Sequence, residues 1–308
     1  MSVAVKDIIH ALNTSLSRII YGKTFVTKQA LTCLLAGGHL LLEDLPGMGK
    51  TTLAQGLAKV FGLDFQRVQF TSDLLPADII GGSIFQASSG EFIFRKGPLF
   101  TQVLLADEIN RASPKTQSAL LEAMGEQQLT ADGHTYTLPS PFFVIATQNP
   151  LHQSGTFPLP ESQLDRFMMR LSLGYPSVDA ERLLLKQGST QATLNDLSAL
   201  LTLAQLESLQ QLVHRVKVSD SVLDYLQRLL SYTRESSEFS CGLSPRAALA
   251  WLHCAKAWAM IHQRDYVIPD DLQVLMLSVV GHRLLPKENL STVCTAIESL
   301  KKHVDVVG

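Results

Sequence analysis

The amino-acid sequence predicts an α/β domain built on a parallel sheet, followed by a smaller domain made only of helices. Up to about Pro176, short apolar runs typical of buried strands alternate with helical patterns, as in successive βαβ units. Beyond Gly174-Tyr175-Pro176 the segments show amphipathic helical periodicity and no strand pattern. A chain of 308 residues is long enough for one large domain or two modest ones. We therefore expect an α/β domain at residues 1–175 and a helical domain at residues 176–308.

The individual elements follow from the same patterns. The strand candidates are residues 39–42, 65–70, 103–107 and 142–147. Two further segments, 83–94 and 127–138, are predicted to be hairpins, the second with Asp132-Gly133 as turn residues that favour a positive φ. An ordinary surface hairpin without a special function is an equally good interpretation of each. The helices expected in the second domain are residues 206–216, 221–232, 245–263 and 269–283.

The composition narrows the class of protein. Hydrophobic residues make up 46% of the chain and charged residues 18%, which argues against intrinsic disorder. Lys and Arg total 26 against 28 for Asp and Glu, so the chain lacks the overall positive charge that favours binding to a nucleic-acid backbone. The four cysteines form no CxxC pair, and neither a secretory signal nor an apolar run of about 18 residues is apparent. We expect a cytoplasmic protein without a zinc site, a membrane span or a nucleic-acid partner.

A glycine-rich loop between a predicted strand and a predicted helix is the strongest functional signal. Small glycines allow backbone N–H groups to approach phosphate oxygens at the positive end of the following helix. Lys50 is expected to contact the β- and γ-phosphates, and the hydroxyl of Thr51 is expected to bind Mg²⁺. The residues predicted to hold the nucleotide phosphates are Pro46, Gly47, Met48, Gly49, Lys50, Thr51 and Thr52.

Asp44 departs from the usual phosphate-loop pattern, GxxxxGK[ST], because it occupies the first glycine position. The part that faces the phosphates is complete, so the departure concerns the turn into the loop more than its chemistry. A chance glycine-rich turn is the alternative interpretation, and the strand before the loop and the helix after it argue against it.

A second apolar strand ends in two carboxylates, Asp107 and Glu108. Parallel sheets bind ligands at the carboxyl ends of their strands, where these acids are expected to lie. Asp107 suits a magnesium site, because Mg²⁺ prefers oxygen ligands and keeps several waters. Glu108 is the candidate base that positions the attacking water. The alternative is a solvated acidic helix start.

Two further polar residues are candidates for the same site. Asn149 follows the strand at residues 142–147, where a neutral amide can orient a water molecule against the γ-phosphate; a simple turn residue before proline is the alternative. Ser244 and Pro245 predict a helix start that places Arg246 in the first turn. Because the helix dipole disfavours a cation there, an anion is expected opposite Arg246, and a surface ion pair is the alternative.

Taken together, the sequences PGMGKTT, LLADEINRASPKTQSALLEAMGEQQ, IATQNP, LPESQLDRF and GLSPRA resemble the MoxR family of AAA+ ATPases. The resemblance extends over residues 19–283 and implies an αβα P-loop core with a small helical lid domain, assembled as a ring, usually of six subunits. Members of this family commonly carry Glu-Asp before the Pro-Gly of the loop, which fits Asp44.

The resemblance also implies roles for particular residues. Asp107 and Glu108 match the Walker B acids, Asn149 the sensor 1 residue and Arg246 the sensor 2 arginine. Tyr21 and Gly22 match the segment that holds the adenine. Arg166 matches the arginine finger, supplied to a neighbouring subunit, whereas Arg111 has a weaker match to a residue facing a neighbour. Residues 79–97 match the helix-2 insert, and residues 127–139 match the pre-sensor 1 hairpin.

These assignments predict an enzyme that converts ATP and water to ADP and phosphate. We expect each subunit to bind Mg·ATP between its core and its lid, with Arg246 of the same chain and Arg166 of a neighbour contacting the phosphates. The resemblance further implies chaperone-like maturation of a protein client, or metal-cofactor insertion, with a von Willebrand factor A domain partner. The alternatives are a nucleic-acid motor, a nucleotide-gated scaffold that hardly hydrolyses ATP, and a magnesium-chelatase-like motor subunit.

Overall fold

The computed structural model describes residues 3–88, 90–149, 156–188, 190–287 and 292–307. Its centre is a five-stranded parallel sheet with the strand order β2-β5-β8-β1-β9. The strands are β1 (Leu40–Glu43), β2 (Phe65–Gln69), β5 (Val103–Asp107), β8 (Phe143–Gln148) and β9 (Met169–Leu171). Because all five strands run in one direction, their carboxyl ends meet at a single edge of the sheet. The glycine-rich loop follows β1 at this edge, and Asp107 ends β5 there.

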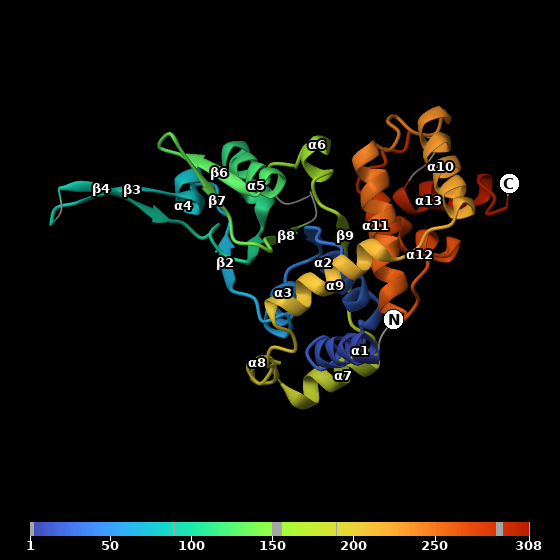
Figure 1. The fold of residues 1–308 in the computed structure, drawn as a ribbon, viewed down its shortest axis with the longest axis horizontal. Coiled ribbons are helices and arrows are strands. Elements are labelled where there is room, and N and C mark those ends of the chain that lie inside the picture. Colours follow the sequence, from blue (N-terminus) through green and yellow to red (C-terminus); the bar gives the residue numbers. More distant parts are fainter. Residues whose placement is uncertain (1–2, 89, 150–155, 189, 288–291, 308) are drawn as a thin grey trace.

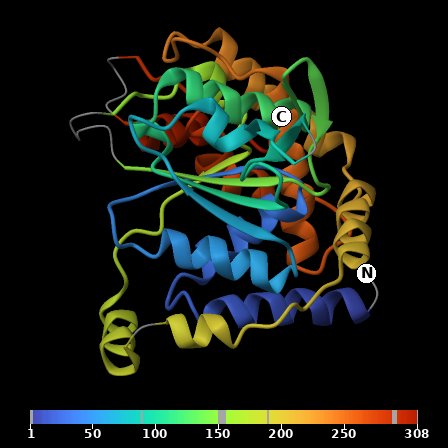
Figure 2. The same cartoon turned by 90° about the vertical axis from the view of Figure 1, so that its left-hand side faces the viewer.

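The central strands are apolar up to the polar residues at their carboxyl ends, because both faces of the sheet are covered. Leu40 and Leu42 of β1 belong to one hydrophobic cluster, whereas Leu41 belongs to the other. Continuous apolar runs of this kind are typical of parallel sheets buried on both sides. On one face pack α1 (Val3–Ser17), α2 (Thr24–Leu35) and α3 (Lys50–Val60); on the other pack α4 (Pro76–Ile80) and α5 (Pro114–Glu126) (Figures 1 and 2). The first domain therefore has the predicted αβα layers.

Two hairpins leave the layers on the α4–α5 side. One consists of β3 (Gly81–Gln86) and β4 (Glu91–Lys96) and projects far from the sheet (Figure 1); the other consists of β6 (Gln128–Ala131) and β7 (His134–Thr137). Asp132 and Gly133 have φ values of 51° and 77°, as the turn prediction requires. The Asp132 carboxylate accepts hydrogen bonds from the hydroxyl (2.5 Å) and the amide (3.2 Å) of Ser83. These contacts join the tip of the β6–β7 hairpin to the base of the β3–β4 hairpin.

The remaining elements are helical, apart from β9. They are the short helix α6 (Glu161–Leu164), then α7 (Val178–Gln187), α8 (Gln191–Asn195), α9 (Leu203–Arg215), α10 (Asp220–Glu235), α11 (Pro245–Ile261), α12 (Pro269–Val280) and α13 (Val293–His303). Among the described residues no strand follows residue 176, as predicted. Strand β9 is the strand of the central sheet that was not predicted, because its three residues, Met-Arg-Leu, carry too little pattern.

The chain continues to pack against the first domain after its last strand, β9. Helices α7 and α8 lie beneath the α/β layers beside α1 and α3 (Figures 1 and 2). The ammonium of Lys59 in α3 donates to the carbonyl of Leu194 (2.9 Å), and the amide of Leu200 donates to the carbonyl of Val60 (2.9 Å). Residues 178–201 are thus attached to the first domain, although they are helical.

Helices α11 and α12 pack directly on α2 and on β9, and one continuous hydrophobic cluster includes side chains from both domains. The ring of Trp258 meets Phe25 of α2 edge to face at 5.7 Å, and Gln29 donates to the Ser278 hydroxyl (2.6 Å). The buried guanidinium of Arg283 donates through Nε to Asp165 (2.7 Å), just before β9. The two domains therefore share a core.

Candidate functional site

The glycine-rich loop connects β1 to α3 at the carboxyl edge of the sheet. Gly47 and Gly49 have φ values of 84° and 89°, a conformation that favours glycine, and Gly49 caps the N-terminus of α3. Lys50 is the first residue of the helix, and its ammonium lies within the loop, donating to the carbonyl oxygens of Asp44 and Leu45 (3.3 Å to Leu45). Burial lowers the pKa of Lys50, while the nearby carboxylates oppose this shift.

A cavity of about 380 Å³, called the phosphate cavity below, lies in front of this loop and brings together most of the predicted residues. Its walls include Lys50, Thr51, Asp107, Glu108 and Asn149, which come from three different elements. The Lys50 ammonium is 3.3 Å from the side-chain oxygen of Asn149, so the phosphate loop and the end of β8 are in direct contact. Pro46, Gly47, Gly49 and Thr52 complete the predicted part of the wall. Pro150, which ends the IATQNP sequence, lies outside the described residues.

Glu108 has an unusual backbone conformation for a residue with a side chain. Its φ of 56° and ψ of 49° are in the left-handed region, which residues with a side chain adopt rarely and which recurs at functional sites. The carboxylate accepts hydrogen bonds from the amide nitrogen of Asn149 (3.3 Å) and from the guanidinium of Arg111 (3.1 Å). Arg111 thus pairs with Glu108 of its own chain. These contacts hold the carboxylate at the wall of the cavity.

Two residues that the sequence analysis did not single out hold the acids in place. The hydroxyl of Thr147 donates to Oδ1 of Asp107 (2.6 Å) and accepts the amide of Glu108 (2.8 Å), so it fixes both acids from the neighbouring strand. Arg67 of β2 donates to Oδ2 of Asp107 through Nε (3.1 Å) and Nη2 (2.7 Å). Thr147 lies at the end of a predicted strand and could have been suspected, whereas the strand order that brings Arg67 to Asp107 is not visible in the sequence.

A second cavity, of about 400 Å³, adjoins the first and shares Gly47, Gly49 and Thr52 with it. We call it the base cavity, because it contains the segment predicted to hold the adenine base. Its walls are formed by both apolar and polar residues and include Met48 and, as predicted, Tyr21. Gly22, with a φ of 69°, lies behind it against α7, where a Cβ atom would be 3.0 Å from Cβ of Ala180. The predicted base-binding segment therefore lies beside the phosphate loop, in a cleft suited to a flat aromatic base.

Asp44 has a structural role that explains its presence in place of glycine. Its buried carboxylate accepts hydrogen bonds from the hydroxyl of Ser172 (2.8 Å) and from the backbone amides of Leu173 and Gly174 (3.1 Å to Gly174). Gly174 and the following Tyr175 line the base cavity. Since the carbonyl of Asp44 also accepts from Lys50, this residue connects the phosphate loop to the wall of the base cavity.

Replacing Asp44 by alanine is expected to destabilise the protein and weaken nucleotide binding. The change leaves the Ser172 hydroxyl and two backbone amides without their acceptor, and an unsatisfied buried donor costs about 1–3 kcal/mol. Urea denaturation would measure the loss of stability, and fluorescence titration with a labelled ADP would measure the affinity. Asp64→Ala is the matched control, because the side chain of Asp64 is exposed and makes no hydrogen bond among those described. Unchanged ADP affinity in Asp44→Ala would refute the link to the base cavity.

Arg166 and Arg246 are not brought to the phosphate loop of their own chain. Arg166 is half-buried, and its guanidinium donates to the carbonyl of Leu121 in α5 (2.5 Å). Arg246 is exposed in the first turn of α11, whose cap, Ser244, donates to Asp165 (3.1 Å). Residues 165–168 precede β9, so both arginines lie toward the amino edge of the sheet, opposite the phosphate loop. The expectation that Arg246 completes the site of its own chain does not fit this geometry.

The donor set at the phosphate cavity suits a magnesium ion held jointly by protein and phosphate. Thr51 and Asp107 line the same cavity and present oxygen atoms, the ligand type that Mg²⁺ prefers. Among the described residues no group of three or more His, Cys, Asp or Glu side chains is placed to hold a metal ion by itself.

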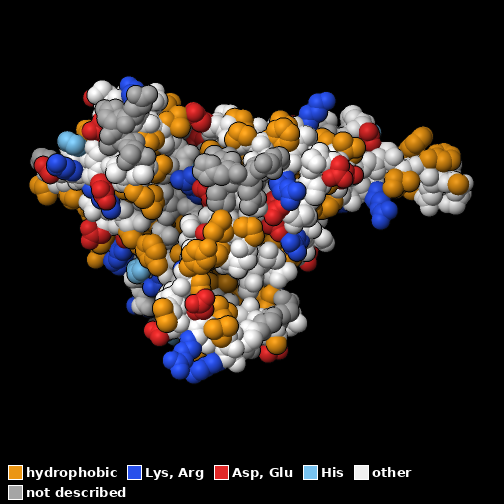
Figure 3. Space-filling view, turned by 180° about the vertical axis from the view of Figure 1, so that it is seen from behind, with side chains coloured by type: hydrophobic (Ala, Val, Ile, Leu, Met, Phe, Trp, Pro, Cys, Tyr) orange, Lys and Arg blue, Asp and Glu red, His pale blue; other side chains and the backbone are white. Residues whose placement is uncertain are grey.

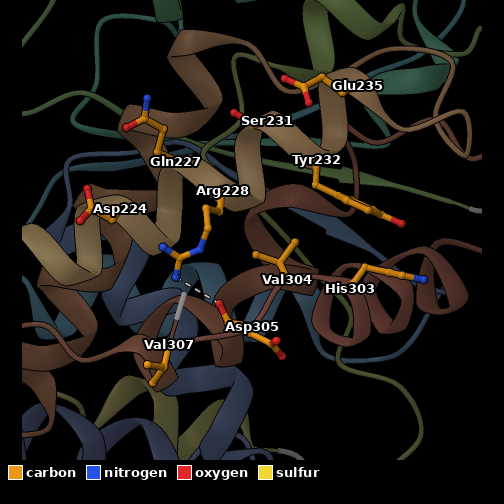
Figure 4. A pocket seen from close by; sticks show the side chains of 10 residues that line it. All are labelled: Asp224, Gln227, Arg228, Ser231, Tyr232, Glu235, His303, Val304, Asp305 and Val307. Carbon is orange, nitrogen blue, oxygen red and sulfur yellow. Dashed lines mark hydrogen bonds between the residues drawn. The ribbon is translucent and has the colours of Figure 1, made fainter.

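A further pocket, of about 680 Å³, lies between α10 and the C-terminal segment (Figure 4). There Arg228 donates to the carbonyl oxygens of Asp305 (3.2 Å) and Val306 (3.1 Å), and the ring of His303 stacks on Tyr232. These contacts attach the C-terminal segment to α10. The pocket contains none of the predicted site residues.

Comparison with known proteins agrees with this geometry. The profile described as "ATPase family associated with various cellular activities (AAA)" matches residues 39–169, and the profile of an AAA lid domain matches residues 231–298. The latter leaves out α7 and α8, which pack on the core. No helix among the described residues has the length and apolar character needed to cross a membrane.

Similar proteins extend over most of the chain. The uncharacterized protein YeaC of Bacillus subtilis is 47% identical, covering 88% of this chain and 84% of its own length. Chaperone MoxR1 of Mycobacterium tuberculosis is 39% identical, covering 90% of this chain and 76% of its own. The crystal structure of a candidate ATPase from Cytophaga hutchinsonii superposes with a TM-score of 0.90 at 35% identity, covering 98% of this chain and 96% of that one. The chain therefore belongs to the MoxR family of AAA+ ATPases.

Proposed function

We propose that this protein hydrolyses Mg·ATP to ADP and phosphate and uses the reaction to remodel a protein client. One observation carries the proposal: Lys50, Thr51, Asp107, Glu108 and Asn149 converge on one cavity that adjoins a base-sized cleft. A cation, a hydroxyl, two carboxylates and an amide in this arrangement are the groups that phosphoryl transfer to water requires.

The chain's own residues have distinct parts in the proposed reaction. Lys50 neutralises charge on the outer phosphates, and its present contacts with loop carbonyls show that its ammonium reaches the centre of the loop. Glu108 accepts a proton from the attacking water, and Asn149, which contacts the Glu108 carboxylate, orients that water. A magnesium ion held by Thr51 and Asp107 would add stabilisation of the charge on the phosphate oxygens.

We further propose that the site is completed by a second copy of the chain. Arg166 and Arg246 lie toward the edge of the sheet opposite their own phosphate loop and are held near each other through Asp165 and Ser244. A head-to-tail assembly would bring this edge of one protomer to the phosphate cavity of the next, and repetition of such a contact closes a ring. Both arginines would then act on a neighbour's γ-phosphate. We expect six subunits, from the family resemblance.

The two hairpins are the proposed contacts with the client. The β3–β4 hairpin exposes apolar side chains on both of its faces, and they stand out at the end of the projection in Figure 3. Phe85 and Phe92 are 55% and 73% exposed, with ring centroids 5.4 Å apart. Exposed apolar groups of this kind suit protein binding. A chaperone role is also supported by the name of the mycobacterial relative.

The hairpins offer little to a nucleic acid. The tip of the β6–β7 hairpin carries Asp132, whose carboxylate accepts hydrogen bonds from Ser83, and the overall charge is −2. Phosphate binding requires a local excess of Lys and Arg. A protein client is therefore the better proposal than a nucleic-acid motor, and DNA is expected to leave the ATPase rate unchanged.

Turnover measured against protein concentration tests the core of this proposal. Since each site needs arginines from a neighbour, the rate per protomer should rise with protein concentration in the presence of Mg·ATP and then reach a plateau. Sedimentation velocity under the same conditions should show the growth of the assembly over the same range. A rate per protomer that does not depend on protein concentration would refute completion of the site by a neighbour. Absence of turnover at every concentration would refute the proposal that the protein hydrolyses ATP.

The client and partner require a separate experiment. A Glu108→Gln protein with ATP should retain the client-bound state, so proteins recovered with ATP but not with ADP are the client candidates. We expect a protein with a von Willebrand factor A domain among them, and a client that undergoes maturation, for instance by insertion of a metal cofactor. We also propose a cytoplasmic location, supported by the four cysteines, which are all free thiols. Recovery of the same proteins with ADP would argue against a nucleotide-driven client cycle.

A further inference from the structure

The ion pair between Arg67 and Asp107 lies inside the phosphate cavity. Arg67 is on the edge strand β2, where the register places it beside Leu105 and places Gln69 beside Asp107. From there its guanidinium reaches along the strand and binds Oδ2 of Asp107 through two nitrogens, with a further contact to Gln69 (3.3 Å). Arg67 and Gln69 both line the cavity together with Thr51. A cation of the protein is thus bound to the acid proposed to hold magnesium.

The two oxygens of the Asp107 carboxylate differ in how easily they can be released. Oδ1 accepts from Thr147, a fully buried residue whose hydroxyl is also fixed by the backbone of Glu108. Oδ2 accepts from Arg67, whose side chain is 49% exposed and can turn toward solvent. The guanidinium is therefore the exchangeable partner, and a divalent ion that uses Oδ2 must compete with it.

We propose that Arg67 is the protein's own counter-charge for Asp107 and is exchanged for magnesium when a nucleotide binds; this inference rests on the proposed ATPase function. Arg67 keeps the carboxylate paired while no ion is bound, which avoids an unpaired, largely buried charge. Its competition lowers the affinity for a divalent ion that arrives alone. An ion that arrives with a nucleotide is held by the phosphates as well and can displace the guanidinium. Arg67 would thus make ion binding depend on nucleotide binding.

Manganese binding measured by electron paramagnetic resonance tests this role. Mn²⁺ is titrated into the wild-type protein saturated with ADP, and into the variants Arg67→Ala and Arg67→Lys. Removing a competing ion pair should tighten Mn²⁺ binding, on the order of fivefold for Arg67→Ala. Arg67→Lys keeps the positive charge but loses the paired hydrogen bonds. Its affinity for Mn²⁺ should therefore lie between those of the wild type and Arg67→Ala. If the alanine variant does not fold, the lysine variant still gives the comparison.

Arg111→Gln is the matched control, because it removes an equal charge from a similarly exposed side chain that pairs with Glu108 instead of Asp107. Its Mn²⁺ affinity should change less than that of Arg67→Ala. An equal change in the two variants would mean that only the local charge matters and would overturn the proposal. Unchanged or weaker Mn²⁺ binding in Arg67→Ala would overturn it as well, since a purely structural ion pair predicts that result. Absence of any Mn²⁺·ADP binding to the wild type would refute the nucleotide site itself.

Discussion

Glu108→Gln is expected to bind ATP with nearly unchanged affinity and to hydrolyse it about 10²–10⁴-fold more slowly. The amide has the shape of the carboxylate and can keep the contact with Asn149, but it cannot accept a proton from water. Equilibrium binding of a fluorescent ATP analogue and single-turnover hydrolysis at saturating protein separate the two effects.

The control for this variant is Glu122→Gln, which makes the same chemical change on the exposed surface of α5. Its hydrolysis rate should stay close to that of the wild type. A Glu108→Gln protein that hydrolyses ATP at the wild-type rate would remove Glu108 from the reaction. A variant that also loses ATP binding would instead indicate that Glu108 is needed to build the cavity. The left-handed backbone of Glu108 is the reason to measure ATP binding separately from hydrolysis.

Arg166→Ala is expected to lower hydrolysis by about 10³–10⁵-fold, the range found for arginine fingers, without removing ATP from its own phosphate loop. The side chain lies toward the opposite edge of the sheet from Lys50, so its loss should affect the neighbouring site. Mixing Arg166→Ala subunits with Glu108→Gln subunits should therefore restore part of the activity. At some interfaces an intact Glu108 then faces an intact Arg166.

Arg246→Ala should behave in the same way in the mixing experiment, because α11 begins beside the segment that carries Arg166. Arg215→Ala is a suitable control, since Arg215 is an exposed arginine at the end of α9. Arg215→Ala protein should hydrolyse ATP at the wild-type rate without being mixed with another variant. If mixed assemblies are confirmed by mass spectrometry and no activity returns, the arginines do not act between protomers.

Local sequence determines a large part of this fold and site. The phosphate loop, the strand that ends in Asp107 and the cap at Ser244 each depend on neighbouring residues, and the structure contains all three. The cap itself was predicted correctly: Ser244 accepts the amide of Ala247 (3.0 Å). Which edge of the sheet α11 would approach depends instead on the packing of α11 against α2 and of α12 against β9, which no local pattern encodes.

The residues that the sequence analysis missed have a common cause. Thr147 and Arg67 act on Asp107 from two different strands, and the carboxylate of Asp44 binds backbone atoms about 130 positions away. Each contact requires the strand order β2-β5-β8-β1-β9, in which strands distant along the chain are neighbours. The short strand β9 was missed for the same reason, because its pairing with β1 defines it more than its composition does.

The shared core of the two domains affects how force would travel through an assembly. Swinging α11 and α12 away from α2 would expose Trp258 and break the buried contact of Gln29 with Ser278, so such a motion is costly. We therefore expect the two domains to move together as one rigid unit. The nucleotide cleft lies at one edge of this unit and the two arginines lie toward the opposite edge. In the proposed assembly, hydrolysis would then change the contacts between neighbouring molecules, and each projecting hairpin would move together with the molecule that carries it.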